Sequence, residues 1–395
     1  MSEAPFQVRS WTTRVVNVGA ATSDVLPGLL DELGAKRVFL LASATLSGID
    51  DAMAPIRRSL GSRLVVEYSR IRPHVPFSDL VKAVAALRFS QADIVVAVGG
   101  GSIGEAGKVL PLCLKYGVTS DDDAEGFRAA YQWDGTTVQR SAETAPELPV
   151  ICVPTTLSGG EYNHRHGVTW PDVGKRGIGH ELSAPWAVIQ DPYLAAFTPD
   201  WAWHSTGMRA VDHAVEGLVS PWTNNYWRTS GVAGLAALTD GLRAVAADTR
   251  DTAGRELSQL GAWQVITPLL NGVPFGLSHA IGHSLGGLFD VPHGYSSCAV
   301  MAAVQEWNAE MGVDGLNDVA RALGRPGYPV DHSLRELILE LGLPSSLGEV
   351  GVAPGQHRAI AESAFEDRPS RTNPRAVGGA DDIVDVLRLA QTRRS

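Results

Sequence analysis

Apolar and polar residues alternate along the first half of the chain with two different periods. Short runs rich in β-branched residues predict strands, and stretches with apolar residues three and four apart predict helices. The predicted strands span residues 36–43, 63–69, 93–101, 148–154 and 186–194, and the predicted helices span residues 48–60 and 77–88. Because strands and helices that alternate in this way form a parallel, doubly wound sheet, we expect an α/β domain that binds a nucleotide.

Strand signals nearly stop after residue 194. Helical periodicity marks residues 206–220, 231–249, 334–342 and 381–394. We therefore predict an amino-terminal, doubly wound α/β dinucleotide-binding domain at residues 1–191 and an all-helical catalytic domain at residues 192–395. The polar stretch at residues 116–147 predicts a surface loop.

Composition narrows the class of protein. The 395 residues are 44% hydrophobic and 19% charged, which is typical of a globular protein. The net charge of −10 and the lack of a basic run argue against nucleic acid as a partner. No apolar run reaches the roughly 20 residues of a membrane span, and the first residues lack a secretory core. We therefore expect a cytoplasmic protein, with Cys113, Cys152 and Cys298 as reduced, buried thiols.

A glycine run follows the predicted strand at residues 93–101. Gly99, Gly100, Gly101 and Ser102 lie where that strand turns into a helix. Glycines let the backbone approach a phosphate, and the free N–H groups of the helix start attract an anion. The run predicts a pyrophosphate site, although it lacks the common G-x-G-x-x-G spacing. A tight turn without a ligand is the alternative.

The same residues also satisfy the pattern G-x-S-x-G, with Ser102 at the nucleophile position of an α/β-hydrolase. An oxyanion segment of the HGGG type is missing upstream. The helical second half also lacks the strands that would carry the acid and the histidine. A serine hydrolase is therefore the less favoured alternative.

Three histidines cluster in the segment SHAIGHSLGGLFDVPHG at residues 278–294. His279 and His283 are four residues apart and share one face of a helix, and His293 follows after a glycine break. Three imidazoles that converge on one point serve metal ligation or proton transfer. Three unrelated packing residues are the remaining alternative.

Another histidine lies on the helix predicted at residues 206–220. Its apolar stripe is formed by Met208, Val211, Val215 and Leu218, which leaves Arg209, His213 and Glu216 on a different face. Charged helix faces usually meet water. Taken alone, this pattern predicts a solvent-exposed face, with a cleft as the alternative.

Several motifs occur together in the order of one known family. They are RPHVP, GGGS, VPTT, DPYL, TGMRAVDHAVE and HAIGHSLGGLFDVPHG, between residues 37 and 308. On these motifs the chain resembles the iron-containing alcohol dehydrogenase superfamily, and within it most resembles the maleylacetate reductases. The resemblance implies an α/β nucleotide domain followed by an all-helical domain, a homodimer, and NAD(H) or NADP(H) as cofactor.

The resemblance also assigns residues to the cofactor. It places the pyrophosphate at the glycine run, and it places Thr155, Thr156 and Lys175 near the cofactor. Ser43 stands where NAD-selective relatives have an aspartate that would repel a 2′-phosphate. We therefore expect no preference between NADH and NADPH, with Arg57 or Arg58 able to assist a phosphate.

The family's metal site departs from its pattern here. Metal-dependent members use an aspartate and three histidines, and His213, His279 and His293 match the histidines. Arg209 replaces the aspartate. A guanidinium donates hydrogen bonds only and repels a divalent ion, so we expect a metal-free site. The alternative is a metal-dependent (iron or zinc) alcohol or aldehyde dehydrogenase whose metal is held by the three histidines alone.

The resemblance implies reduction of a small acidic ene-oxo compound, as in the conversion of maleylacetate to 3-oxoadipate during aromatic degradation. His283 is then the proton donor, and His213, His279 and His293 orient it or the substrate. Arg209 pairs with a substrate carboxylate or the developing enolate. A binding protein without catalytic activity is a further alternative.

Overall fold

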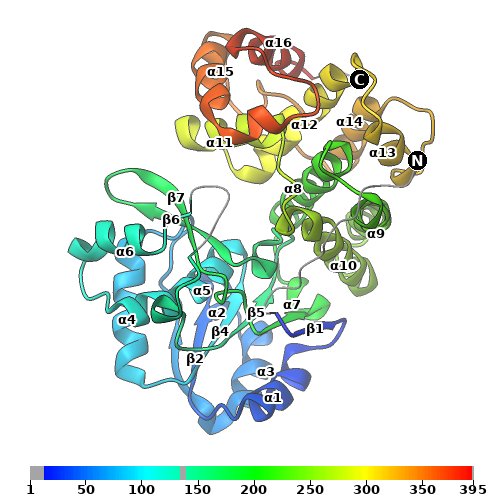
Figure 1. The fold of residues 1–395 in the computed structure, drawn as a ribbon. Coiled ribbons are helices and arrows are strands. Elements are labelled where there is room, and N and C mark those ends of the chain that lie inside the picture. Colours follow the sequence, from blue (N-terminus) through cyan, green and yellow to red (C-terminus); the bar gives the residue numbers. More distant parts are fainter. Residues whose placement is uncertain (1–12, 134–138, 394–395) are drawn as a thin grey trace. The chain divides into compact units, whose positions relative to one another are not determined.

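The computed structural model describes residues 13–133 and 139–393, and the chain divides into two compact units between Thr198 and Pro199 (Figure 1). The unit that ends at Thr198 contains both sheets of the structure. The unit that begins at Pro199 contains helices and the loops between them, with no strand among its described residues.

A parallel sheet organises the first unit. Its strands are β1 (Val15–Val18), β2 (Val38–Ala42), β3 (Leu64–Tyr68), β4 (Ile94–Gly99), β5 (Val150–Pro154) and β8 (Ala187–Gln190). They lie in the order β1-β8-β5-β4-β2-β3, and every neighbouring pair is parallel. The predicted doubly wound sheet is confirmed. Since all strands are parallel, the carboxyl ends of β2, β4 and β5 meet at one edge of the sheet.

Helices connect or follow these strands along the chain. They are α1 (Thr22–Leu33), α2 (Ala44–Ser47), α3 (Asp50–Leu60), α4 (Phe77–Ser90), α5 (Gly101–Tyr116), α6 (Ala124–Ala130) and α7 (Pro192–Ala195), with short 3-10 turns at Gly61–Arg63, Asp121–Asp123, Ala142–Thr144 and Gly160–Tyr162. Apolar residues of α1 and α3, including Leu26 and Ile56, pack on Val38, Leu40 and Val96 of the sheet. Burial of this apolar surface is the main stabilising contribution.

Three parts of the first unit differ from the predicted pattern. An antiparallel hairpin of β6 (Arg165–Trp170) and β7 (Gly174–Gly179) was not predicted, because most of its residues are polar or glycine and its apolar residues do not form a run. β1 was also missed. The stretch at residues 116–147 was expected to be a loop, but it includes α6; its residues 134–138 lie outside the described chain.

The second unit is an assembly of helices. They are α8 (Asp200–Val219), α9 (Asn225–Ala247), α10 (Thr252–Leu270), α11 (Leu277–Phe289), α12 (His293–Ala309), α13 (Gly315–Ala322), α14 (Val330–Glu340), α15 (His357–Glu366) and α16 (Ala380–Ala390), with 3-10 turns at η5 (Pro354–Gln356) and η6 (Arg368–Thr372). The predicted all-helical architecture is confirmed for the described residues. None of the helices in the described chain has both the length and the apolarity to cross a membrane.

The core of this unit is built by facing apolar sides of α11, α12, α15 and α16. Leu277, Ile281 and Leu285 of α11 pack with Val300 of α12 and Ile360 of α15. The three cysteines, one in this unit and two in the first, are buried free thiols, as predicted. Burial raises the pKa of each thiol, so none is a ready nucleophile.

Helices α9 and α10 approach each other through glycines. A Cβ atom on Gly261 of α10 would lie 2.6 Å from the backbone N of Leu238 and 2.7 Å from the carbonyl oxygen of Gly234, both on α9. Backbone atoms cannot turn away as a side chain can. Only glycine therefore permits this separation of the two helices.

We expect Gly261→Ala to lower the free energy of unfolding by about 2 kcal/mol or more, because the added methyl group overpacks the helix contact. Urea unfolding followed by circular dichroism measures the loss. Gly28→Ala on α1 is the matched control, since a Cβ atom there has no neighbour within 4 Å, and it should keep or slightly raise stability. Equal unfolding midpoints for the Gly261 variant and the unchanged protein would contradict the glycine contact.

Candidate functional site

The glycine run forms a tight turn between β4 and α5. Gly99 has φ of +154°, a value that favours glycine, and Gly100 is the N-cap of α5. A Cβ atom on Gly100 would lie 3.2 Å from Cγ2 of Thr156, and one on Gly101 would lie 2.9 Å from Oγ of Ser158. The backbone is therefore closely packed here, and the first N–H groups of α5 have no partner within the helix. Such a helix start fits a pyrophosphate.

The other residues assigned to the cofactor gather at the same edge of the sheet. Thr155 follows β5 and donates its backbone N–H to the carbonyl oxygen of Gly99, at 3.1 Å. Ser43 follows β2, caps α2, and has its Cβ 3.2 Å from the position of a Cβ on Gly99. Lys175 of β7 has Nζ 3.8 Å from Oε2 of Glu105, on the second turn of α5. The structure thus brings the predicted cofactor residues together.

Ser102 lies on the first turn of α5. Its Oγ accepts a hydrogen bond from the backbone N–H of His74, at 3.1 Å. His74 and Val75 both have positive φ, which is a strained conformation for side chains of this kind. The RPHVP segment is therefore held against the helix start. The partner in this hydrogen bond is a backbone N–H group, whereas a nucleophilic serine needs a side chain that accepts its proton as a general base.

Arg57 is already paired within the protein and is not free to bind the 2′-phosphate of NADPH. Its Nε and Nη2 each lie 2.8 Å from a carboxylate oxygen of Glu67, and Nη2 also donates to the carbonyl oxygen of Ser47. The hydrogen bond to Glu67 is the main reason that the pKa of Arg57 is raised. Only Arg58, which is exposed, keeps the role suggested for the two arginines.

Four histidines of the second unit come from three helices. His213 lies on α8, His279 and His283 lie on α11, and His293 is the first residue of α12. The rings of His213 and His279 are stacked with centroids 5.1 Å apart, and Phe275 stacks on His279 at 3.9 Å. The rings of His279 and His283 are 6.3 Å apart, and those of His283 and His293 are 6.4 Å apart. The histidines therefore form one cluster.

The charged face of α8 is buried, so the prediction of a solvent-exposed face is wrong. His213 and Glu216 are within the protein, and the Arg209 side chain is only 13% exposed. Burial is the largest cause that lowers the pKa of His213 and of His279 well below its usual value, and Arg209 adds to it. Both rings are therefore neutral.

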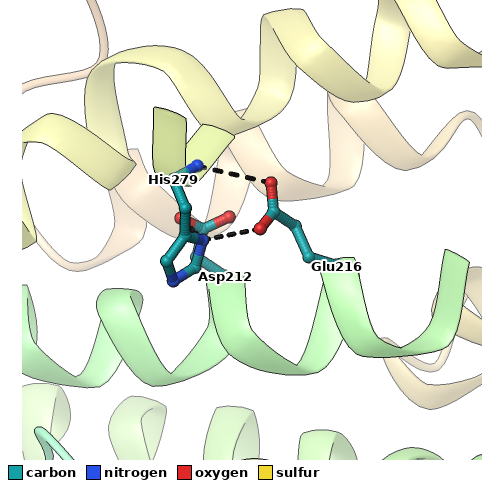
Figure 2. Close-up of side chains that lie close together, drawn as sticks. All are labelled: Asp212, Glu216 and His279. Carbon is teal, nitrogen blue, oxygen red and sulfur yellow. Dashed lines mark hydrogen bonds and ion pairs between the residues drawn. The ribbon is translucent and has the colours of Figure 1, made fainter. Parts of the chain in front are cut away.

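Glu216 fixes the start of α11. One of its oxygens accepts from the backbone N–H of Gly276 and the other from that of Ser278, each at 2.7 Å. Nδ1 of His279 also lies 2.6 Å from Glu216, a close approach without the alignment of a hydrogen bond (Figure 2). Burial raises the pKa of Glu216, against the lowering effect of these N–H groups and of Arg209. Glu216 acts as a buried helix cap.

Asp212 is the partner of the buried guanidinium. Nη1 of Arg209 lies 3.5 Å from Oδ2 of Asp212 and donates to Oγ of Ser297, at 3.0 Å. The same Oδ2 accepts from the hydroxyls of Ser278 and Ser297, each at 2.8 Å. Both interactions of Arg209 use Nη1. Within the described chain, Nε and Nη2 of Arg209 make no hydrogen bond. These two nitrogens can donate to a bound anion.

His283 has a carboxylate partner that the sequence did not reveal. Its Nδ1 is 2.6 Å from Oδ2 of Asp367, and the two side chains are 45% and 31% exposed. Asp367 lies between α15 and η6, 84 positions along the chain. The sequence did contain a signal for the pairing of Asp212 with Arg209, since the two lie three residues apart on one helix. No comparable pattern in the sequence indicates the contacts of Asp367, Ser278 or Ser297.

His213, His279 and His293, the histidines that match the family's metal ligands, do not form a compact set of ligand atoms in this structure. Among the described residues, the one set of three His, Cys, Asp or Glu ligand atoms within 4.8 Å of one another is Asp212, Glu216 and His279. His213 and His293 are not part of it. The carboxylates of that set already accept hydrogen bonds from serine hydroxyls and backbone N–H groups. A guanidinium beside them also opposes a divalent cation.

Comparison with known proteins agrees with this arrangement of domains. Residues 13–192 match the description "Iron-containing alcohol dehydrogenase", and residues 204–391 match "Fe-containing alcohol dehydrogenase family, C-terminal". The chain is 31% identical to Dehydrogenase FUM7 of Gibberella moniliformis over 392 residues, which cover 91% of each protein. It is 27% identical to Maleylacetate reductase 1 of Cupriavidus pinatubonensis over 357 residues, which cover 90% of each.

A solved structure shares the fold at lower sequence identity. Sulfoacetaldehyde reductase from Bifidobacterium kashiwanohense, in complex with NAD+, has a TM-score of 0.85 and 17% identity, over 99% of this chain and 100% of that one. Family matches over both units and a relative above 30% identity establish the assignment. The chain is an oxidoreductase that belongs to the iron-containing alcohol dehydrogenase family and is similar to the maleylacetate reductases.

Proposed function

We propose that this protein uses NADH or NADPH to reduce the activated double bond of a small ene-oxo acid, as in maleylacetate, without a metal ion. The observation that carries the proposal is the largely buried Arg209, which stands at the family's aspartate position with two nitrogens able to bind an anion. Similarity to maleylacetate reductases supports the substrate class. Family membership argues against the serine hydrolase and the binding protein without activity.

The glycine turn is suited to the cofactor. Side chains on Gly100 or Gly101 would fill the space next to Thr156 and Ser158, so the bare backbone N–H groups can reach a pyrophosphate. Lys175 and Ser102 supply further donors there. The relative solved with NAD+ supports a nicotinamide cofactor, and Ser43 lacks the charge that would exclude NADPH.

When bound, the reduced nicotinamide supplies a hydride to the alkene carbon that is β to the ketone. The electron pair of the double bond then moves toward the ketone oxygen, and an enolate develops. Nε and Nη2 of Arg209 donate to that oxygen or to a neighbouring carboxylate, which lowers the energy of the developing negative charge. His283 gives a proton to the α-carbon, which completes the saturated oxo acid, and solvent restores the proton to the ring.

The other residues of the cluster support these two groups. His213 and His279 are neutral, so they add no cation that would compete with Arg209 for the substrate's charge. Asp212 holds Nη1 of Arg209, and the hydroxyls of Ser278 and Ser297 hold Asp212. A guanidinium fixed in this way needs little rearrangement as the enolate forms.

Arg209 is tested by two substitutions. We expect Arg209→Ala to lower kcat for an ene-oxo diacid about a hundredfold or more, because one preorganised donor to an oxyanion contributes that much. Arg209→Asp recreates the family's ligand set and should gain bound zinc or iron, approaching one ion per chain by elemental analysis. The unchanged protein should stay active after dialysis against a chelator. Loss of its activity, with one ion per chain beforehand, would favour the metal-dependent dehydrogenase.

Arg335→Lys is the matched control for Arg209. Arg335 is also largely buried and pairs with Glu306 and Asp331, but on α14. This variant should keep kcat within a factor of about two and should bind no metal. If it loses activity as strongly as Arg209→Ala, loss of any buried arginine explains the effect, and the assigned role of Arg209 is wrong.

The glycine turn is tested by Gly101→Val. The new side chain would meet Ser158 and cover the N–H groups of α5, so we expect NADH affinity to fall about a hundredfold, or roughly 2.7 kcal/mol. Nicotinamide fluorescence titration measures it. Gly104→Ala on the same helix has no neighbour within 4 Å of the new Cβ and should bind normally. Equal affinities for both variants would contradict the pyrophosphate site.

A further inference from the structure

We infer that Asp367 is a positioning residue that holds the His283 ring in one orientation and one tautomer. The inference rests on the proposed function, in which His283 gives the proton. Nδ1 of His283 is 2.6 Å from Oδ2 of Asp367, within the range of a strong hydrogen bond to a carboxylate. Because a carboxylate only accepts, Nδ1 must carry a hydrogen atom. The proton transferred to substrate therefore comes from Nε2 of the protonated ring, and its transfer leaves the neutral tautomer with its hydrogen on Nδ1.

The backbone of Asp367 is held by its own turn. Its N–H donates to the carbonyl oxygen of Ala364 at 3.2 Å, and its carbonyl oxygen accepts from the backbone N–H of Ser370 at 3.1 Å and from Oγ of Ser370 at 2.7 Å. These bonds close the end of α15 and the start of η6 around one residue. The position from which the carboxylate extends is thereby defined.

The segment that carries Asp367 is also tied to the segment that carries His283. Oγ1 of Thr372 donates to the carbonyl oxygen of Phe275 at 2.5 Å, and Oδ1 of Asn373 accepts from the backbone N–H of Leu277 at 3.3 Å. Both contacts lie at the start of α11, one to two turns before His283. Isolated surface ion pairs contribute little because their side chains are free to separate. Here the two backbones are fastened to each other.

The neighbouring rings limit the other orientations of His283. His279 and His293 face it edge to face, with interplanar angles of 88° and 75°. Half a turn of the ring would place Cδ2 in the position of Nδ1 and would break the hydrogen bond to Asp367. A ring whose Nδ1–H is bonded to a carboxylate keeps Nε2 as the atom that gives and regains the proton, as in hydrolases where an aspartate orients the catalytic histidine.

The first experiment observes the tautomer directly and needs no substrate. In protein labelled with 15N-histidine, two-bond 1H–15N spectra should show the hydrogen of His283 on Nδ1, assigned by loss of the signal in His283→Ala. Asp367→Asn should remove that preference. Asp385→Asn is the matched control, because Asp385 pairs with Arg388 on the exposed side of α16, and it should leave the spectrum unchanged. A tautomer unaffected by Asp367→Asn would overturn the inference.

The second experiment uses chemical rescue. We expect Asp367→Ala to lower kcat at least tenfold while KM changes less than threefold, because substrate binding does not depend on the tautomer. Both side chains are partly exposed, so added formate can enter and accept from Nδ1. Formate should restore kcat severalfold in Asp367→Ala and have no effect in His283→Ala. Absence of rescue in folded protein, or an equal loss in kcat and KM, would indicate a merely structural residue.

The two experiments separate this inference from the proposed function. If the unchanged protein reduces no ene-oxo acid, the proposed function fails, while the spectra still decide whether Asp367 sets the ring. If it reduces such an acid and His283→Ala is as active, His283 is not the donor and the inference fails while the substrate class stands.

Discussion

The helical unit is organised around the permanent positive charge of Arg209. Arginine stays protonated in proteins, so a largely buried guanidinium must be neutralised by partners that the fold supplies. Asp212 provides the charge, and Ser278 and Ser297 bring hydroxyls from α11 and α12 to the same carboxylate oxygen. The network therefore joins α8, α11 and α12. Breaking such a buried pair by removing one partner costs about 3–5 kcal/mol, so the charge also stabilises the geometry around it.

Burial, together with the same charge, divides the histidines by their chemistry. Burial lowers the pKa values of His213 and His279, and Arg209 adds to the effect, which leaves these rings neutral near pH 7. Glu216 serves the backbone at the start of α11 and is not available as a free base. His283 is the exposed member of the cluster, and its hydrogen bond points to a carboxylate outside α8 and α11. The proposed mechanism therefore gives proton exchange to His283, the most exposed ring of the cluster.

The sequence predicted those elements of the fold that depend on short stretches of neighbouring residues. Apolar β-branched runs gave β2, β4 and β5, and the glycine run gave the turn at Gly99. The β6–β7 hairpin was not predicted, because most residues of its two strands are polar or glycine. The charged face of α8 looked exposed, because nothing in its own sequence shows that Ser278 and Ser297 will satisfy Asp212. Pairs distant in sequence, such as His283 and Asp367, are fixed by packing and not by periodicity.

The proposed replacement of the family's metal ion by a guanidinium also bears on which carbonyl compounds suit this site. At equal distance and dielectric, a single positive charge stabilises an oxyanion by half as much as a double charge does. Reduction of a simple ketone or aldehyde concentrates negative charge on one alkoxide oxygen and gains most from the stronger cation. In an ene-oxo acid, conjugation spreads the charge of the enolate over carbon and oxygen. The weaker, permanently placed Arg209 is therefore better matched to conjugate reduction, and its spare donors also match a substrate that carries carboxylates.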